Sequence, residues 1–354
     1  MNTRSVLVTG HEGYIGSVLT GKLLAAGYRV SGLDAGFFTN CSWDQRPLLD
    51  HSTKIDIRDL PDDFLQADPP DTVIHLAALS NDPLGELAPG VTEEINHRAA
   101  VRLMDLSREA GVKRFVYFSS QSMYGVSVSD DELTEDDSAK NPVTAYARTK
   151  WAAEQHIRSH NSREFVTCAL RPSTVFGPSP AFRSDIIMNN MTSMAIENGL
   201  IELHTDGTPW RPIVHIDDVA AAAIAMVSAP ADLVGGRAFN VGVPNGNYTV
   251  RQIAQAVATA NSVPFEVGAH PDKDPRSYRV SFSRILGELS DWYSPRWGLE
   301  SGANSLAEYL AAKREAGFEL LSARTVRIRR LQELQAQGLI DSHLRWQPDA
   351  EGAA

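Results

Sequence analysis

A glycine-rich turn between a short apolar strand and a helix is the feature that most constrains the fold of this chain. Residues Ser5–Thr9 read SVLVT, a β-branched and apolar run that predicts a buried strand. The motif GHEGYIG follows at 10–16, and a helical pattern begins there. In this spacing Gly10 permits the tight turn, Gly13 lets the backbone approach a pyrophosphate, and Gly16 lets the helix pack closely on the strand. Unpaired N–H groups at the helix N-terminus would favour the phosphates.

A carboxylate closes the second predicted strand, Arg29–Leu33. Asp34 lies eighteen residues after Gly16, where a carboxylate accepts hydrogen bonds from both ribose hydroxyls of adenosine and repels a 2′-phosphate. The sequence therefore predicts NAD as cofactor in preference to NADP. The stretch GSVLTGK at 16–22 is close to a P-loop, but Leu23 stands where magnesium needs a hydroxyl and the stretch falls inside the helix. Nucleoside-triphosphate hydrolysis is therefore not expected.

Further apolar strands alternate with helical patterns along the first half of the chain. The predicted strands are Thr72–Leu76, Phe115–Phe118 and Phe165–Leu170, and the predicted helices are Gly16–Ala26, Ile95–Ala110 and Ala145–Arg158. This alternation predicts an α/β fold, a doubly wound parallel sheet of Rossmann type with helices on both faces. Continuous apolar strands fit a sheet that is buried on both sides.

The pattern loosens after about residue 178, which indicates a smaller second lobe. We expect residues 1–177 plus about 213–243 to form the NAD-binding domain, with strands at Ile213–His215 and Ala238–Val241. Residues 178–212 plus about 244–354 are expected to form a discontinuous α/β substrate-binding lobe with a charged, helical C-terminal tail.

Charge and cysteine content exclude several classes of protein. The chain has 354 residues, with 33 Lys and Arg against 44 Asp and Glu, so its formal net charge is −11. We therefore expect neither a nucleic-acid nor a membrane partner, since both require a basic surface. Only Cys41 and Cys168 are present, which show no metal-ligand spacing, so we expect no metal. The chain enters a strand at once and its longest apolar run, 219–227, is too short to span a bilayer, so a cytoplasmic location is expected.

A tyrosine and a lysine four residues apart carry the candidate chemistry. Tyr146 and Lys150 form a Y-x-x-x-K pattern on a predicted helix, where positions i and i+4 share a face. A lysine charge beside the phenol would lower its pKa and make it a base for a substrate hydroxyl. The motif FSSQSMYG at 118–125 follows a strand end, where open α/β sheets place their ligand sites.

Taken together, these motifs resemble the extended short-chain dehydrogenases/reductases, specifically the NAD-dependent epimerase/dehydratase family that acts on nucleotide sugars. The resemblance covers roughly residues 5–295. It depends on GHEGYIG, DIRD at 56–59, HLAA at 75–78, FSSQSMYG, NPVTAYARTK at 141–150, LRPSTVFGP at 170–178 and RPIVHIDDVA at 211–220.

The resemblance implies roles for particular residues. Ser120, Tyr146 and Lys150 would be the catalytic triad. The implied cofactor-binding residues, besides the triad members Tyr146 and Lys150, are Gly10, Gly13, Tyr14, Ile15, Gly16, Asp34, Asp56, Ile57, Leu76, Ala77, Ala78, Asn96, Ser119 and Pro172. The implied substrate-binding residues are Ser80, Gln121, Ser122, Thr174, Arg211, Arg276 and Arg279. The implied partners are a nucleotide-diphosphate sugar and a second copy of the chain in a homodimer.

Three departures from the family pattern limit the reaction. The 4,6-dehydratases of this family carry Asp-Glu after their Ser or Thr, whereas this chain has Gln121 and Ser122, so elimination of water is disfavoured. Ser122 occupies the place of a cysteine acid/base in some C3/C5 epimerases, but serine is a weak substitute. Thr174 replaces the usual Asn before the V-x-G-P motif.

Three functions therefore stay open. The first is an NAD-dependent nucleotide-sugar epimerase that works through a transient 4-keto intermediate. The second is a nucleotide-sugar 4-ketoreductase or dehydrogenase of a deoxysugar pathway, which would use the same triad. The third is a dinucleotide-sensing regulator without activity, although such proteins usually lose the Tyr/Lys pair.

Overall fold

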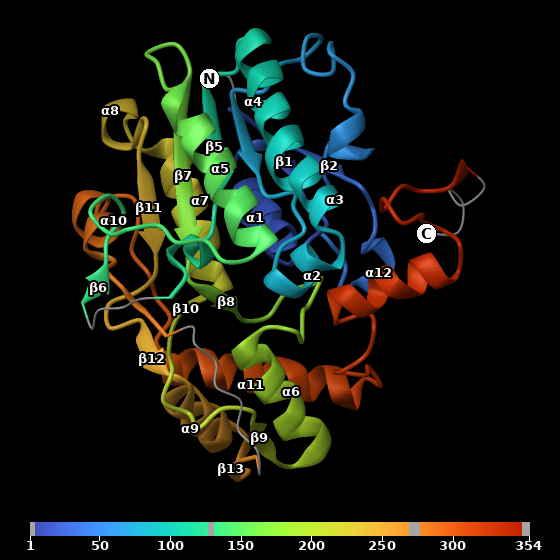
Figure 1. Cartoon of the computed structure of the whole chain (residues 1–354), viewed down its shortest axis with the longest axis vertical. Coiled ribbons are helices and arrows are strands. Elements are labelled where there is room, and N and C mark those ends of the chain that lie inside the picture. The colour runs from blue at the N-terminus through green and yellow to red at the C-terminus, as the bar shows by residue number, and fades with distance from the viewer. Residues whose placement is uncertain (1–3, 127–130, 269–276, 349–354) are drawn as a thin grey trace.

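A seven-stranded parallel sheet forms the centre of the molecule (Figure 1). The computed structural model describes residues 4–126, 131–268 and 277–348. The strand order is β11-β7-β5-β4-β1-β2-β3. The bounds are β1 Ser5–Thr9, β2 Arg29–Asp34, β3 His51–Lys54, β4 Thr72–His75, β5 Arg114–Phe118, β7 Val166–Pro172 and β11 Ala238–Val241. The sequence predicted all of these strands except β3. That strand is short and polar and lies at the edge of the sheet, so it lacks the apolar run that marks the others.

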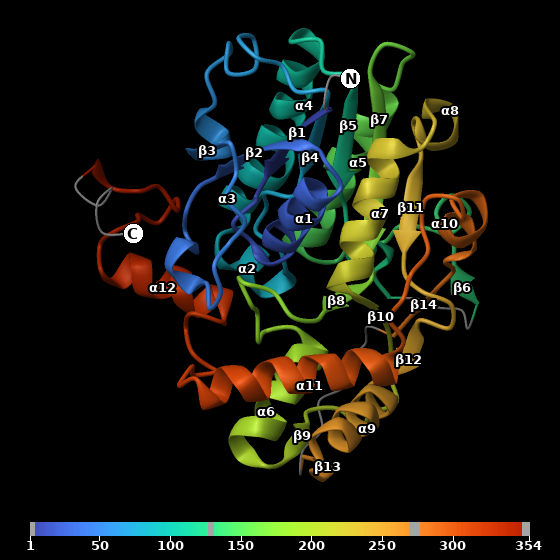
Figure 2. The same ribbon diagram turned by 180° about the vertical axis from the view of Figure 1, so that it is seen from behind.

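Helices cover both faces of the sheet, which confirms the doubly wound fold. Helices α1 (Tyr14–Ala25) and α7 (Ile216–Ser228) lie on one face (Figure 2). Helices α3 (Pro89–Glu93), α4 (Ala100–Glu109) and α5 (Ala145–Ser159) lie on the other (Figure 1). The chain order reverses between β1 and β4, and ligands of such sheets bind in the crevice outside the carboxyl ends of the strands at this point.

The predicted helix at 95–110 is interrupted at its start. Residues Glu94–Ala99 form a π-helical segment, and the regular helix α4 begins at Ala100. Three short helices also lie around the sheet, α2 (Asp82–Leu87), α8 (Ala231–Val234) and α10 (Ser283–Glu288). A small separate sheet pairs β6 (Glu132–Leu133) with β14 (Arg279–Val280). No helix in the described residues is both long and apolar enough to cross a bilayer.

A smaller group of elements lies beyond the carboxyl ends of the strands. Helices α6 (Ile187–Asn198), α9 (Val250–Asn261) and α11 (Leu299–Glu315) share one apolar core that includes Met188, Ile253 and Leu306. The strands there are β9 (Ile201–Leu203) with β13 (Phe265–Val267), and β8 (Thr174–Phe176) with β10 (Trp210–His215) and β12 (Asn247–Thr249).

The expected assignment of the whole 244–354 stretch to the smaller lobe needs a correction. Helix α12 (Arg327–Ala336) and the residues after it pack on the sheet domain, where Leu331, Leu334 and Leu344 join the core around Leu7 and Leu33. Residues 280–293 also join a core of that domain. The apolar positions of these segments match the sheet domain, and sequence periodicity alone does not show which core a helix joins. The remaining domain bounds stay a prediction.

Candidate active site

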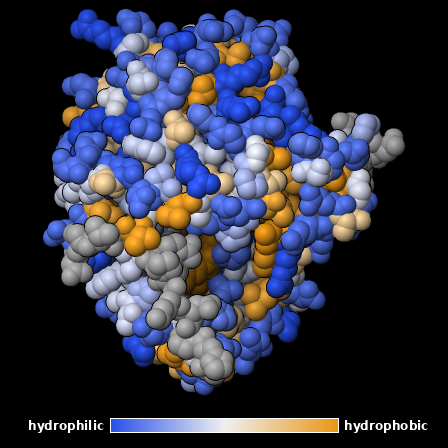
Figure 3. Space-filling model, viewed as in Figure 1, coloured by the Kyte–Doolittle hydropathy of each residue, from blue (hydrophilic) through white to orange (hydrophobic). Residues whose placement is uncertain are grey.

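A cavity of about 740 Å³ lies at the carboxyl ends of β1, β2, β4 and β5. Apolar side chains gather around a hollow near the middle of this face of the molecule (Figure 3). Most of the predicted site residues line the cavity: Gly10, Gly13, Tyr14, Ile15, Gly16, Asp34, Asp56, Ile57, Leu76, Ala77, Ala78, Ser80, Ser119, Ser120, Gln121, Ser122, Tyr146, Lys150, Pro172, Thr174 and Arg211. The structure therefore brings together residues that lie far apart in the sequence, such as Gly10 and Arg211.

The glycine-rich turn has the geometry that its sequence predicts. Gly10 has a φ of +73°, and a Cβ there would lie 2.8 Å from the backbone nitrogen of Ala77. A Cβ on Gly16 would lie 2.1 Å from the carbonyl oxygen of Gly10, so only glycine lets α1 begin so close to β1. Gly13 and Gly16 both line the cavity, which leaves backbone space for a pyrophosphate.

Asp34 lies at the end of β2 and lines the cavity. One carboxylate oxygen accepts the backbone N–H of Gly36 at 2.9 Å, and the other accepts that of Glu12 at 3.1 Å. Burial raises the pKa of this carboxyl, the N–H of Gly36 opposes the rise, and the carboxylate of Glu12 adds to it. Two acids near this end of the cavity would both repel a 2′-phosphate.

Two predicted cofactor contacts have other partners in the structure. The carboxylate of Asp56 pairs with Arg58 at 2.7 Å. Asp56 also lines the cavity, and its contact with the cofactor stays a prediction. Asn96 is buried and is not among the described residues that line the cavity. Its amide bridges the backbone of Leu79, accepting from the N–H at 2.8 Å and donating to the carbonyl at 3.0 Å. Asn96 therefore holds the loop after β4, which itself lines the cavity.

The first turn of α5 places Tyr146. Thr144 caps this helix by accepting the N–H of Ala147 at 3.1 Å, and its hydroxyl donates to Asp82 at 2.6 Å. The backbone of Gly85 on α2 approaches so closely that a Cβ there would lie 2.8 Å from the Cβ of Tyr146. These contacts fix the start of α5 against α2 and hold the phenol on the cavity.

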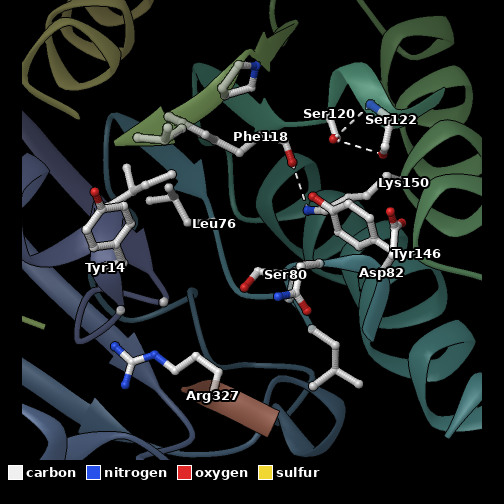
Figure 4. A pocket seen from close by; sticks show the side chains of 18 of the residues that line it. Tyr14, Leu76, Ser80, Asp82, Phe118, Ser120, Ser122, Tyr146, Lys150 and Arg327 are labelled. Carbon is white, nitrogen blue, oxygen red and sulfur yellow. Dashed lines mark hydrogen bonds between the residues drawn. The ribbon is translucent and has the colours of Figure 1, made fainter. Parts of the chain in front are cut away.

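Lys150 lies one helical turn further on and is buried. Its Nζ donates to the carbonyl oxygen of Phe118 at 2.8 Å (Figure 4). The same Nζ lies 5.0 Å from the centre of the Tyr117 ring. It has no acidic partner within ion-pair distance in the described part of the chain. Burial lowers the pKa of this ammonium to about 7. A buried cation that lacks a counter-ion favours binding of an anionic or polar ligand beside it.

The expectation that Lys150 lowers the pKa of Tyr146 is wrong for the protein alone. The pKa of this phenol is raised to about 12, chiefly by burial. A hydrogen bond with Ser120 opposes the rise, and the charge of Asp82 adds to it. The hydroxyl of Ser120 also accepts a hydrogen bond from the hydroxyl of Ser122 at 2.9 Å (Figure 4). The sequence spacing did not reveal the burial that dominates this pKa.

Not all of the predicted substrate-binding residues line the cavity. Gln121 is held by a hydrogen bond from its amide to the carbonyl oxygen of Arg171 at 3.0 Å. Arg279 stacks on Trp210 at 5.3 Å and is not among the described residues that line the cavity. Arg276 lies outside the described residues. Among those residues, no group of three or more His, Cys, Asp or Glu side chains is placed to hold a metal ion.

Sequence reasoning missed several polar residues of the cavity. Arg183 and Asp185 form a buried ion pair at 2.8 Å, and Arg183 also donates to Ser80 at 2.7 Å. Asp82 and Arg327 line the same cavity. The RSD at 183–185, shortly after the LRPSTVFGP motif, was the available signal for the first pair. Arg327 has no signal of this kind, because it lies in the tail beyond the matched segment.

The fold and the site together define an enzyme of the extended short-chain dehydrogenase/reductase class. The chain belongs to the NAD dependent epimerase/dehydratase family, whose model matches residues 6–242. The residues present fit NAD, because the glycine turn leaves room at the helix N-terminus and Asp34 closes β2. The cofactor of this enzyme is NAD.

The chain is also similar to individual proteins of this class. The chain is 31% identical over 316 residues to a UDP-glucose 4-epimerase of Mycolicibacterium smegmatis, which covers 87% of this chain and 98% of the relative. The structure of MoeE5 in complex with UDP-glucuronic acid and NAD has a TM-score of 0.74 and 28% identity, covering 87% of this chain and 99% of that one. The NDP-hexosamine 5,6-dehydratase TunA shares the fold, with a TM-score of 0.75, 20% identity and coverage of 88% and 98%.

Proposed function

We propose that this protein is an NAD-dependent nucleotide-sugar 4-epimerase. The proposal rests on one observation, that Ser120, Tyr146 and Lys150 line the same cavity as the glycine-rich turn. A UDP-hexose or UDP-hexuronic acid is the proposed substrate class, because the relatives carry these sugars in their names. The homodimer that the family resemblance implies is part of the same proposal.

Each residue of the triad has a distinct task in this proposal. Tyr146 removes the proton of the C4 hydroxyl, and Ser120 donates a hydrogen bond that stabilises the developing alkoxide. Lys150 contributes positive charge at the buried end of the cavity. Bound NAD would supply the hydride acceptor and donor, together with a positive charge that favours the phenolate. The 4-keto sugar turns over in the cavity, and Tyr146 returns the proton when the hydride comes back on the other face.

The residues around Ser120 favour epimerisation over loss of water. Elimination from C5 and C6 needs an acid and a base beside the sugar. Gln121 is bonded to a backbone carbonyl, and the hydroxyl of Ser122 donates to Ser120, so neither supplies a carboxylate. Asp82 lines the cavity on the Tyr146 side, where it accepts the hydroxyl of Thr144.

Incubation of the holoenzyme with UDP-glucose and with UDP-glucuronic acid in D₂O tests the proposal. We expect the C4 epimer to appear without deuterium at any ring carbon, because the hydride returns from the cofactor. We also expect no net change in the absorbance of reduced nicotinamide. Deuterium at C3 or C5 in the product, a 4-keto-6-deoxy product, or stoichiometric reduction of NAD would each contradict it. The Tyr146→Phe variant is the control for chemistry at this site.

A further inference from the structure

A C-terminal segment, residues 327–347, packs on the sheet domain beside the cavity, and its first residue, Arg327, lines the cavity. The side chain of Arg58 donates to the carbonyl oxygens of His343 at 2.9 Å and Leu344 at 3.1 Å. Trp346 donates from Nε1 to the carbonyl oxygen of Ala35 at 2.7 Å and stacks on Phe37 at 5.7 Å. Ala35 and Phe37 line the cavity, so the segment is fastened to its adenosine end.

The chain just before this segment is fixed by Ser184. Ser184 donates its backbone N–H to the carbonyl oxygen of Thr325 at 3.0 Å, and the two hydroxyls are 2.8 Å apart. Leu331 and Leu334 of α12 are fully buried in the sheet domain. These contacts therefore place Arg327, at the first position of α12, against the cavity.

Arg327 brings a buried positive charge to the cavity. The residue is only 2% exposed. It donates to the carbonyl oxygen of Ala181 at 2.7 Å, and its guanidinium lies 4.4 Å from the centre of the Phe38 ring. It makes no ion pair in the described part of the chain. Burial lowers the pKa of this guanidinium to about 10, whereas Arg183 in the same cavity is neutralised by Asp185.

The position of Arg327 points to the ligand that it would meet. Figure 4 shows Arg327 entering from α12 with its guanidinium on the Tyr14 side of the cavity, away from Tyr146 and Lys150. Tyr14 belongs to the glycine-rich turn, whose helix N-terminus suits phosphate groups. A guanidinium matches a diphosphate because its planar donors bind two oxygens at once. Nothing in the family match assigns this residue, since the match ends at residue 242.

We propose that Arg327 binds the diphosphate of the NAD cofactor, so that the C-terminal segment completes the dinucleotide site. A nucleotide sugar also carries a diphosphate, but Arg327 lies at the glycine-rich end of the cavity and not at the end of the catalytic triad. The inference depends on the cofactor and not on the epimerase proposal.

Binding titrations of Arg327→Gln and Arg327→Lys test this assignment without turnover. The ligands are NAD, ADP, adenosine and UDP, titrated into cofactor-free protein by calorimetry. For Arg327→Gln we expect the affinity for NAD and ADP to fall about ten- to a hundredfold, with adenosine and UDP unchanged. Arg327→Lys keeps the charge without the planar fork, so its loss for NAD and ADP should be smaller. The exposed Arg329→Gln on the same helix is the control for net charge and should bind like wild type.

The outcomes separate the alternatives. Equal affinities of wild type and Arg327→Gln for ADP overturn the proposal. A loss that includes adenosine also overturns it, because it reports a damaged wall and no phosphate contact. A loss confined to UDP assigns Arg327 to the sugar nucleotide and overturns it as well. If Arg327→Gln does not fold, which circular dichroism and a melting curve would show, the Arg327→Lys titrations decide the question.

Discussion

Replacement of Tyr146 by Phe tests the centre of the proposed mechanism. The change removes one hydroxyl and leaves the ring that packs against Gly85. General acid–base groups contribute about 10²–10⁴-fold to rate, so kcat should fall at least about a hundredfold, which is about 2.7 kcal/mol of transition-state stabilisation. NAD affinity and the melting temperature should change little, because within the described structure the change removes the hydrogen bond with Ser120 and leaves the packing of the ring.

The pH dependence gives a second measure of the same residue. The pKa of Tyr146 is raised to about 12 in the protein alone, so the phenol is protonated at neutral pH. A base works as the phenolate, and its fraction rises tenfold per pH unit below the pKa. We therefore expect kcat/KM of the holoenzyme to increase with pH on the acidic side, with an apparent pKa below 12 where bound NAD favours the anion. Tyr146→Phe should lose this limb.

The assay is the rate of C4 epimer formation from UDP-glucose, followed by chromatography, with NAD titrations in parallel. Tyr117→Phe is the matched control. It removes the same hydroxyl from a neighbouring buried tyrosine that does not line the cavity and whose oxygen has no hydrogen-bond partner in the described structure. Its rate should stay close to that of wild type. If Tyr146→Phe keeps more than about a tenth of the wild-type rate, the base lies elsewhere.

Two further changes test the cofactor end and the core. Asp34→Ala should narrow the preference for NAD over NADP, because it removes a carboxylate that repels a 2′-phosphate. The preference is measured as the ratio of the two dissociation constants. Equal affinities of wild type for both cofactors would refute this reasoning. Glu154→Gln should destabilise the protein by about 3–5 kcal/mol in urea unfolding, because Glu154 pairs with Arg171 at 2.6 Å and both side chains are fully buried. The exposed pair of Arg29 and Asp68 is the control, and Asp68→Asn should destabilise the protein far less than Glu154→Gln does.

Local sequence patterns predicted the sheet and the glycine-rich turn well. The turn is predictable because Gly10 and Gly16 must avoid contacts made within a few residues or by the neighbouring strand. The strands β1, β4 and β5 are apolar through most of their length, so their burial on both faces appears directly in the sequence. The edge strand β3 has the sequence HSTK, which carries no apolar alternation and was not predicted.

The electrostatics of the site depend on tertiary packing and were predicted poorly. The spacing of Tyr146 and Lys150 is local, but the pKa of each is dominated by burial under segments remote in the sequence. Arg327 reaches the cavity because Leu331 and Leu334 pack on the sheet domain and because Arg58 and Trp346 fasten the chain that follows. No short motif encodes that docking, so the tail could only be described as helical and charged.

The charges of the cavity explain how an acidic chain can bind anionic ligands. The formal net charge of −11 describes the whole chain, and salt screens exposed charges beyond about 10 Å. Lys150 and Arg327 have no acidic partner in the described part of the chain, and these buried cations come from α5 and α12 to line one cavity. Burying each charge unpaired costs free energy in the empty protein, and a bound phosphate or alkoxide offsets that cost. Binding and folding are therefore coupled through these two residues. NAD should raise the free energy of unfolding by RT ln(1 + [NAD]/Kd). The increase at a given NAD concentration should be smaller when Arg327 is replaced, because Kd is then larger.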